Sequence, residues 1–114
     1  MTEVNFNSSL ININSSGSIF NGCSNLEKVT GLSNTTKLQG SVFYNCGKLS
    51  TIDVDFSKIT ELGAKVFESC TSLDISNLSI PNLTKTIGER DFYRVPISTV
   101  SNLGSCTEIG VSAF

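Results

Sequence analysis

The stretch Ser41-Val-Phe-Tyr-Asn-Cys-Gly-Lys-Leu49 decides the fold, because close copies of it lie on both sides. Ser18-Ile-Phe-Asn-Gly-Cys-Ser-Asn-Leu26 precedes it, and Lys65-Val-Phe-Glu-Ser-Cys-Thr-Ser-Leu73 follows it. Each copy holds an aliphatic residue, then Phe, then Cys three residues later and Leu three residues after that. A pattern that returns at a fixed short period predicts a solenoid, in which each repeat packs against its neighbours.

The spacing of the phenylalanines measures the repeat. Phe20, Phe43 and Phe67 are followed by weaker matches at Phe92 and Phe114, so the separations are 23, 24, 25 and 22 residues. A second anchor stands five residues before each of the last four, usually with glycine after it: Leu38, Leu62 with Gly63, Ile87 with Gly88, and Ile109 with Gly110. Two anchors in one register make a chance match improbable.

A short strand is expected in each unit. Ile52, Val54 and Phe56 alternate with polar residues, which is the period of two that a half-buried strand requires. Val29 occupies the place of Ile52 one repeat earlier. Ser, Thr and Asn make up 40 of the 114 residues and favour turns over helix interiors. We therefore expect short strands joined by turns, with no long helix.

The pattern aliphatic-Gly-x-x-[Ala/Val]-Phe-x-x-Cys-x-x-Leu resembles the BspA-like, or Treponema pallidum-type, leucine-rich repeats. The resemblance covers nearly the whole chain, and the unit around Phe92 departs from it, with Asp91 before the Phe and Val95 in place of Cys. It implies an α/β horseshoe solenoid of short parallel strands, turns and short helical segments. We expect one domain over 1–114, with a partial repeat at 1–17 and repeats at about 18–40, 41–64, 65–89 and 90–114, the last incomplete.

The resemblance also implies a biological setting. Such proteins are found on the surface of, or secreted from, bacteria and some protists, where they act in adhesion and in binding proteins or glycans. On this basis we expect a non-enzymatic recognition module with an extracellular or cell-surface location and a protein or glycan partner. A shared fold does not by itself fix a function.

The predicted core consists of the repeated Phe, Cys and Leu positions: Phe20, Cys23, Leu26, Phe43, Cys46, Leu49, Phe67, Cys70 and Leu73. Because the cysteines occupy one position of successive repeats, we expect a column of buried free thiols. A disulfide and a metal site are the alternatives, although parallel side chains disfavour the first and the absence of His disfavours the second. Cys106 is expected to be another packing residue.

Composition argues against several other functions. The formal net charge is −2, so no basic surface is indicated for nucleic acid, and no apolar run is long enough to insert into a membrane. The first residues, Met1 to Asn5, contain neither a basic nor a hydrophobic segment, so we expect no secretion signal there. We expect no cofactor and no catalysis, because the sequence contains no His. Asp53 and Asp55 share a predicted strand face as paired carboxylates might, but a solvated sheet edge is the simpler interpretation.

The predicted binding surface is the concave sheet face. Its residues, in a register uncertain by one position in the third repeat, are Lys28, Thr30, Thr51, Asp53, Asp74 and Ser76. The chain ends on Ala113 and Phe114, both core positions in this register, so either the chain continues in a longer protein or its end docks onto another copy. End-to-end assembly into a structural protein is the alternative function.

Overall fold

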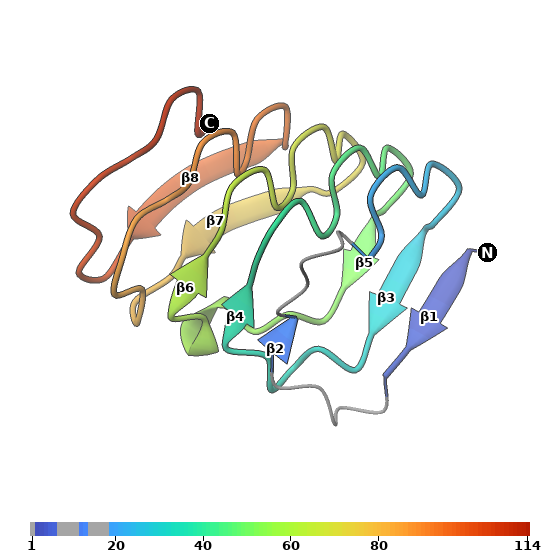
Figure 1. The fold of residues 1–114 in the computed structure, drawn as a ribbon, viewed down its shortest axis with the longest axis horizontal. Coiled ribbons are helices and arrows are strands. Elements are labelled where there is room, and N and C mark those ends of the chain that lie inside the picture. The colour runs from blue at the N-terminus through green and yellow to red at the C-terminus, as the bar shows by residue number, and fades with distance from the viewer. Residues whose placement is uncertain (1, 7–11, 14–18) are drawn as a thin grey trace.

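The structure is a stack of coils built from short parallel strands. The computed structural model of the chain describes residues 2–6, 12–13 and 19–114, so the predicted partial repeat at 1–17 lies mostly outside the described residues. In Figure 1 the colour passes from blue at one end of the stack to red at the other, so sequence order is also the order in space. The only helix among the described residues is the 3-10 turn η1 (Phe56–Lys58), so the expected short helical segments are almost entirely turns.

Two rows of strands follow the stack. The first row contains a three-stranded sheet, in the order β1 (Glu3–Asn5), β3 (Lys28–Thr30) and β5 (Thr51–Ile52), and then the pair β7 (Ile75–Ser79) and β8 (Ile97–Asn102). The second row is the sheet β2 (Asn12–Ile13), β4 (Lys37–Leu38) and β6 (Glu61–Leu62). An isolated parallel bridge between Ile87 and Ile109 pairs the same repeat position further along the chain. All named pairs are parallel, because each strand returns to the same side of the stack after one coil.

The strand register matches the repeat read from the sequence. Val29 pairs with Ile52, one repeat later, and Leu38 pairs with Leu62. Val29, Leu38 and Leu62 are buried, and Ile52 is half-buried. Because a shift of one residue would turn these side chains to the solvent, the apolar positions specify the register.

The phenylalanines form a continuous column through the stack. Phe20, Phe43, Phe67, Phe92 and Phe114 stack in succession, with ring centroids 5.6, 5.4, 5.6 and 5.7 Å apart. The rings are nearly parallel, with interplanar angles of 9°, 7°, 20° and 11°. Phe43, Phe67 and Phe92 are almost completely buried. Burying rings of this size gives each coil a large apolar contact with the next.

Backbone hydrogen bonds tie the same turn of each coil to the next coil. Each Phe N–H donates to the carbonyl of the residue before the following Phe: Phe20 to Val42 (3.0 Å), Phe43 to Val66 (2.9 Å), Phe67 to Asp91 (2.9 Å) and Phe92 to Ala113 (2.8 Å). These bonds provide partners for buried peptide groups in segments that are not part of a sheet. The turns are therefore stacked as regularly as the strands.

The turns require left-handed backbone at two repeated positions. Two residues before the Phe stand Ser41, Lys65, Arg90 and Ser112, with φ between 53° and 59°. Two residues after it stand Gly22, Asn45, Ser69 and Arg94, with φ between 61° and 72°. Non-glycine residues seldom adopt this region, so its recurrence shows that the stacking of coils imposes the turn.

Truncation of Phe43 should reveal the strength of this column. Phe43→Ala leaves a cavity between two stacked rings, and we expect the free energy of unfolding to fall by about 3–5 kcal/mol. Phe114→Ala is the matched control, because Phe114 contacts one ring only and is 47% exposed, so its loss should cost much less. Urea denaturation of both variants measures the difference, and a cost below about 1 kcal/mol for Phe43→Ala contradicts the packed column.

Glycine is required where neighbouring coils approach most closely. A Cβ on Gly63 would lie 2.8 Å from the Gly40 nitrogen, and one on Gly88 would lie 2.5 Å from the Gly63 carbonyl oxygen. The obstructing atoms belong to backbone, so the coils themselves would have to separate. The aliphatic-Gly pair of the sequence therefore marks the contact between coils.

We expect Gly88→Ala to lower the free energy of unfolding by about 1–3 kcal/mol, the usual cost of overpacking. Gly47→Ala is the control, because a Cβ at Gly47 meets no atom within 4 Å. Thermal unfolding of the two variants measures the difference. Equal melting temperatures would show that the coils are not in close contact at Gly88.

Candidate functional site

The strands of the first row present polar side chains to the solvent. We call this surface the first strand face; it consists of the outward side chains of β1, β3, β5, β7 and β8, together with Asp74, which directly precedes β7. On it Lys28, Thr51, Asp74 and Ser76 are exposed, and Thr30 is half-buried. Their alternation with inward apolar side chains puts these residues of different coils on one surface.

Most of these side chains have no hydrogen-bond or ion-pair partner among the described residues. In the described part of the chain, no hydrogen bond or ion pair involves the side chain of Thr51, Asp74 or Ser76. Lys28 Nζ lies 3.9 Å from Glu3 Oε1, and both side chains are about half exposed, so the pair contributes little stability. Their hydrogen-bonding capacity is therefore available to a ligand.

Asp53 departs from the predicted surface. Its side chain turns back to the preceding coil, where Oδ2 accepts from the Gly31 N–H at 2.9 Å and Oδ1 from the Leu32 N–H at 2.8 Å. Both carboxylate oxygens are thus occupied, and the residue is half-buried. The prediction of an exposed binding residue at Asp53 is wrong, because this carboxylate satisfies two peptide groups of a turn.

Asp55 caps the 3-10 turn η1. Its carboxylate accepts from the Ser57 N–H at 3.0 Å and the Ser57 hydroxyl at 2.6 Å, and so caps η1. The hydroxyl bond is the main cause that lowers the pKa of Asp55, followed by the backbone bond. Asp53 and Asp55 therefore bind the backbone of different turns.

The first strand face continues over residues that sequence analysis did not identify. The Thr99 hydroxyl of β8 lies 3.0 Å from the Ser76 carbonyl and 2.9 Å from the Asn77 side-chain oxygen. Asn77 and Thr99 are directly paired and exposed. The sequence of the fourth repeat is too irregular to give this register, although the fully buried Leu78 pairs with Val100 beside it.

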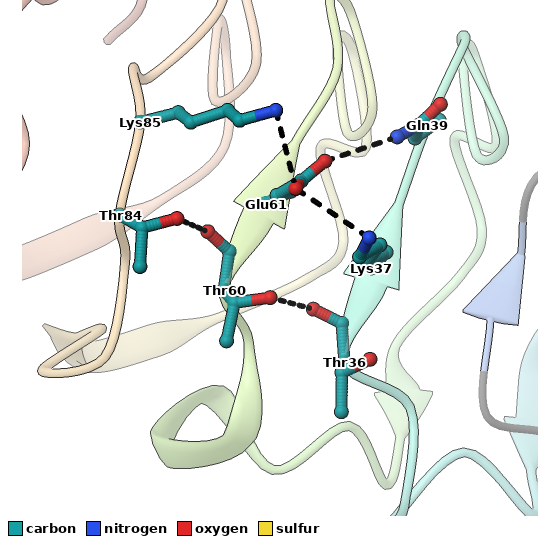
Figure 2. Close-up of polar contacts among 7 residues, drawn as sticks. All are labelled: Thr36, Lys37, Gln39, Thr60, Glu61, Thr84 and Lys85. Carbon is teal, nitrogen blue, oxygen red and sulfur yellow. Dashed lines mark hydrogen bonds and ion pairs between the residues drawn. The ribbon is translucent and has the colours of Figure 1, made fainter.

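The second row of strands carries a charge ladder. Lys37 Nζ and Lys85 Nζ lie 3.5 and 3.2 Å from Glu61 Oε1, and the Gln39 amide lies 3.4 Å from Glu61 Oε2 (Figure 2). The Lys85 contact is the main cause that lowers the pKa of Glu61. We call this surface, with the outward residues of β4 and β6 and Lys85, the second strand face. Its sequence signal was the recurrence of opposite charges at 24-residue spacing.

A threonine ladder lies beside these charges. The Thr60 hydroxyl donates to the Thr36 carbonyl at 3.3 Å, and the Thr84 hydroxyl donates to the Thr60 carbonyl at 3.1 Å (Figure 2). The same two carbonyls accept from the Thr60 and Thr84 N–H groups at 2.8 and 3.0 Å. Polar groups on the second strand face are therefore largely used to join the coils to one another.

The cysteines lie in the stack as free thiols. Cys46 and Cys70 are buried, and their thiols donate to the carbonyls of Phe20 and Phe43, both at 3.0 Å. Burial is the main cause that raises the pKa of Cys46 to about 11 and that of Cys70 to about 12. Because the thiolate is the nucleophile, these two thiols are inert near neutral pH.

The other predicted core residues differ in how deeply they are buried. Phe20, Leu26, Leu49 and Leu73 are buried. Cys23 and Cys106 are only half-buried, which corrects the expectation of an equally buried thiol at each repeat. The Cys106 thiol donates to the Glu108 carbonyl at 3.2 Å, within its own turn.

Asp91 is the polar residue at the position that Val42 and Val66 occupy in earlier repeats. It is completely buried, and its carboxylate accepts from the Gly88 N–H at 2.7 Å and the Val66 N–H at 3.1 Å. Burial outweighs these bonds and raises the pKa of Asp91 to about 6. The carboxylate joins two coils, at the cost of a buried charge at neutral pH.

This pKa makes the stability of the protein depend on pH. The folded protein holds the Asp91 proton more tightly than the unfolded chain, so the contribution of protonated Asp91 is complete below about pH 4 and is lost as the pH rises through about 6. The free energy of unfolding should lose about 3 kcal/mol over this range through this group. In Asp91→Asn, the free energy of unfolding, measured by urea denaturation at each pH, should not show this fall. If the free energy falls equally with pH in both proteins, Asp91 is not its cause.

Within 2–6, 12–13 and 19–114, no group of three or more Cys, Asp or Glu residues is placed to hold a metal ion, and no pocket is found. No helix in this part of the chain has the length and apolarity needed to cross a membrane.

Comparison with known proteins places these features in context. The family profile described as BspA type leucine rich repeat region matches residues 1–114, in six copies. The crystal structure of a leucine-rich repeat protein from Bacteroides ovatus is similar over 100% of this chain, with a TM-score of 0.68 and 25% sequence identity. The chain spans 28% of the length of that protein. None of the curated proteins compared with the chain matches it.

Proposed function

Because the chain belongs to the BspA-type leucine-rich repeat family, we propose that it is a recognition module of a bacterial surface or secreted protein that binds a protein partner through the first strand face. This family suggests protein interaction or adhesion, and its fold is typically non-enzymatic. Its members are typically found at the cell surface or secreted. The proposal adds to these general properties a specific surface, and it prefers a protein partner to a glycan.

The contrast between the two strand faces carries the proposal. On the second strand face, Glu61 already bonds Lys37, Lys85 and Gln39. On the first strand face, the side chains of Thr51, Asp74 and Ser76 are exposed and bond to nothing in the described part of the protein. On a surface whose polar groups lack internal partners, a ligand breaks no hydrogen bonds of the protein when it displaces the bound water.

Two triple variants test which face binds. The purified chain is measured by biolayer interferometry against a panel of extracellular glycoproteins, each before and after enzymatic deglycosylation. Thr51→Ala, Asp74→Ala and Ser76→Ala together should weaken binding at least tenfold. The matched control, Lys37→Ala, Glu61→Ala and Lys85→Ala together, should leave the affinity unchanged, because it removes groups that satisfy one another.

The deglycosylated panel separates the two partner classes. Binding that survives deglycosylation supports a protein partner, and binding that disappears supports a glycan. Retained binding in the first triple variant, with loss in the control, contradicts the assignment of the first strand face.

Assembly of coils between chains is the second candidate function, and exposed apolar side chains of the last coil favour it. Ile109, Val111 and Phe114 are 53%, 75% and 47% exposed. Phe114 stacks on Phe92 and is the last ring of the column in this chain. An apolar surface of this kind matches the inner surface of a further coil.

Sedimentation velocity over a range of concentrations tests this second candidate. If chains dock end to end, the weight-average mass of the isolated chain rises with concentration, and Val111→Lys suppresses the rise by placing a charge in the contact. A monomer at every concentration contradicts assembly through this surface.

A further inference from the structure

A tyrosine with two arginines beside it lies in the turn region between β7 and β8. The Arg90 and Arg94 guanidinium carbons lie 5.3 and 5.4 Å from the centroid of the Tyr93 ring. Both distances are within the range of cation–π attraction. We call Arg90, Tyr93 and Arg94, with Glu68 beneath them, the arginine corner.

The backbone of the corner is fixed by the stacking of the coils. Arg90 and Arg94 occupy the two left-handed positions of their turn, with φ of 54° and 64°. The Tyr93 carbonyl accepts from the Ser69 N–H at 2.8 Å, and the Arg90 N–H donates to the Val111 carbonyl at 3.1 Å. Neighbouring coils on both sides therefore determine where the two arginine side chains start.

Arg90 and Arg94 have different electrostatic environments. Arg90 Nη1 lies 3.2 Å from Oε1 of Glu68, whose side chain is only 6% exposed. Arg94 is exposed and makes no ion pair among the described residues, and neither does the neighbouring Glu89. One guanidinium is thus neutralised, and the other keeps its charge and its hydrogen-bond donors for the solvent.

The ion pair of Arg90 is poorly suited to stabilise the fold. Glu68 Oε2 and Arg90 Nε are both buried and have no hydrogen-bond partner among the described residues. A buried carboxylate with one charged contact and an unsatisfied oxygen recovers little of its desolvation cost. The pair does hold Arg90 against Tyr93, and it thereby restricts the ring that also supports Arg94.

We propose that the arginine corner is a second binding site, at which Arg94 holds a carboxylate of an acidic segment of a partner protein. The planar guanidinium fork matches a carboxylate with two parallel hydrogen bonds, and the Tyr93 ring provides an apolar contact beside it. Tyr and Arg are the residue types that dominate binding at protein interfaces. Because the ring already restrains Arg94, binding requires less ordering of a flexible side chain.

The charges near the corner favour a single carboxylate over a polyanion. Glu68 offsets one of the two arginines, and the chain as a whole carries a net charge of −2. Sulfated polysaccharides gain affinity from rows of cations that displace counterions, as nucleic acids do. A single unpaired guanidinium beside an aromatic ring instead fits one acidic side chain in an otherwise mixed protein surface.

A fluorescein-labelled peptide with a single glutamate among glycine and serine residues is the probe, and fluorescence anisotropy in 150 mM salt is the measurement. The proposal predicts saturable binding that weakens about tenfold in Arg94→Ala and at least threefold in Tyr93→Leu. Arg94→Lys keeps the charge but loses the fork, so its affinity should lie between those of wild type and Arg94→Ala. Circular dichroism establishes that each variant is folded, which is expected because Arg94 is exposed.

Lys58→Ala is the matched control, because Lys58 is exposed and its side chain donates to the Asn34 side-chain oxygen, outside the arginine corner. It removes the same charge far from the corner in sequence, and the affinity should stay within twofold of wild type. Three results overturn the proposal: no saturable binding, equal losses in Arg94→Ala and Lys58→Ala, or tighter binding of a heparin oligosaccharide than of the peptide. The triple variant of the first strand face should bind the peptide normally, so the two sites can fail independently.

Discussion

The contact between equivalent residues of successive coils is the constraint on which the rest of the structure depends. A single coil has no core of its own, since Phe43 is buried only because Phe20 and Phe67 cover its two faces. The same translation that stacks these rings aligns the backbone groups of turns and strands. It also explains the glycine at the closest approach of two coils and the left-handed residues in each turn.

The stacking also orders the surface, because side chains at the same outward position of successive coils form a row. One row can be used internally, as in the bonds of Glu61 to Lys37 and Lys85. Another surface can be left without partners among the described residues, as with Thr51, Asp74 and Ser76. Whether the side chains of a row bond one another depends on the residue types at that position in neighbouring coils. The leucine-rich repeat fold supplies the rows, and the residues at each position determine whether they stabilise the protein or bind a partner.

Sequence analysis could recover the repeat but only part of the surface. The phenylalanine spacing gives the stacking order, because large buried side chains must recur once per coil. Asp53 was assigned wrongly because the alternation of Ile52, Val54 and Phe56 suggests a longer strand than β5, which ends at Ile52. Beyond that residue the chain turns, and Asp53 reaches the peptide groups of Gly31 and Leu32. The corner at Tyr93 depends on side-chain directions that the repeat pattern does not encode.

Nuclear Overhauser effects between phenylalanine rings test the stacking of coils most directly. In a sample with selectively labelled Phe, ring protons of Phe43 should show cross-peaks to Phe20 and to Phe67, and those of Phe67 should show cross-peaks to Phe92. No cross-peak is expected between Phe20 and Phe92, which are separated by two rings of the column. Absence of the neighbouring cross-peaks, or a direct contact between Phe20 and Phe92, would contradict a column to which each coil contributes one stacked ring.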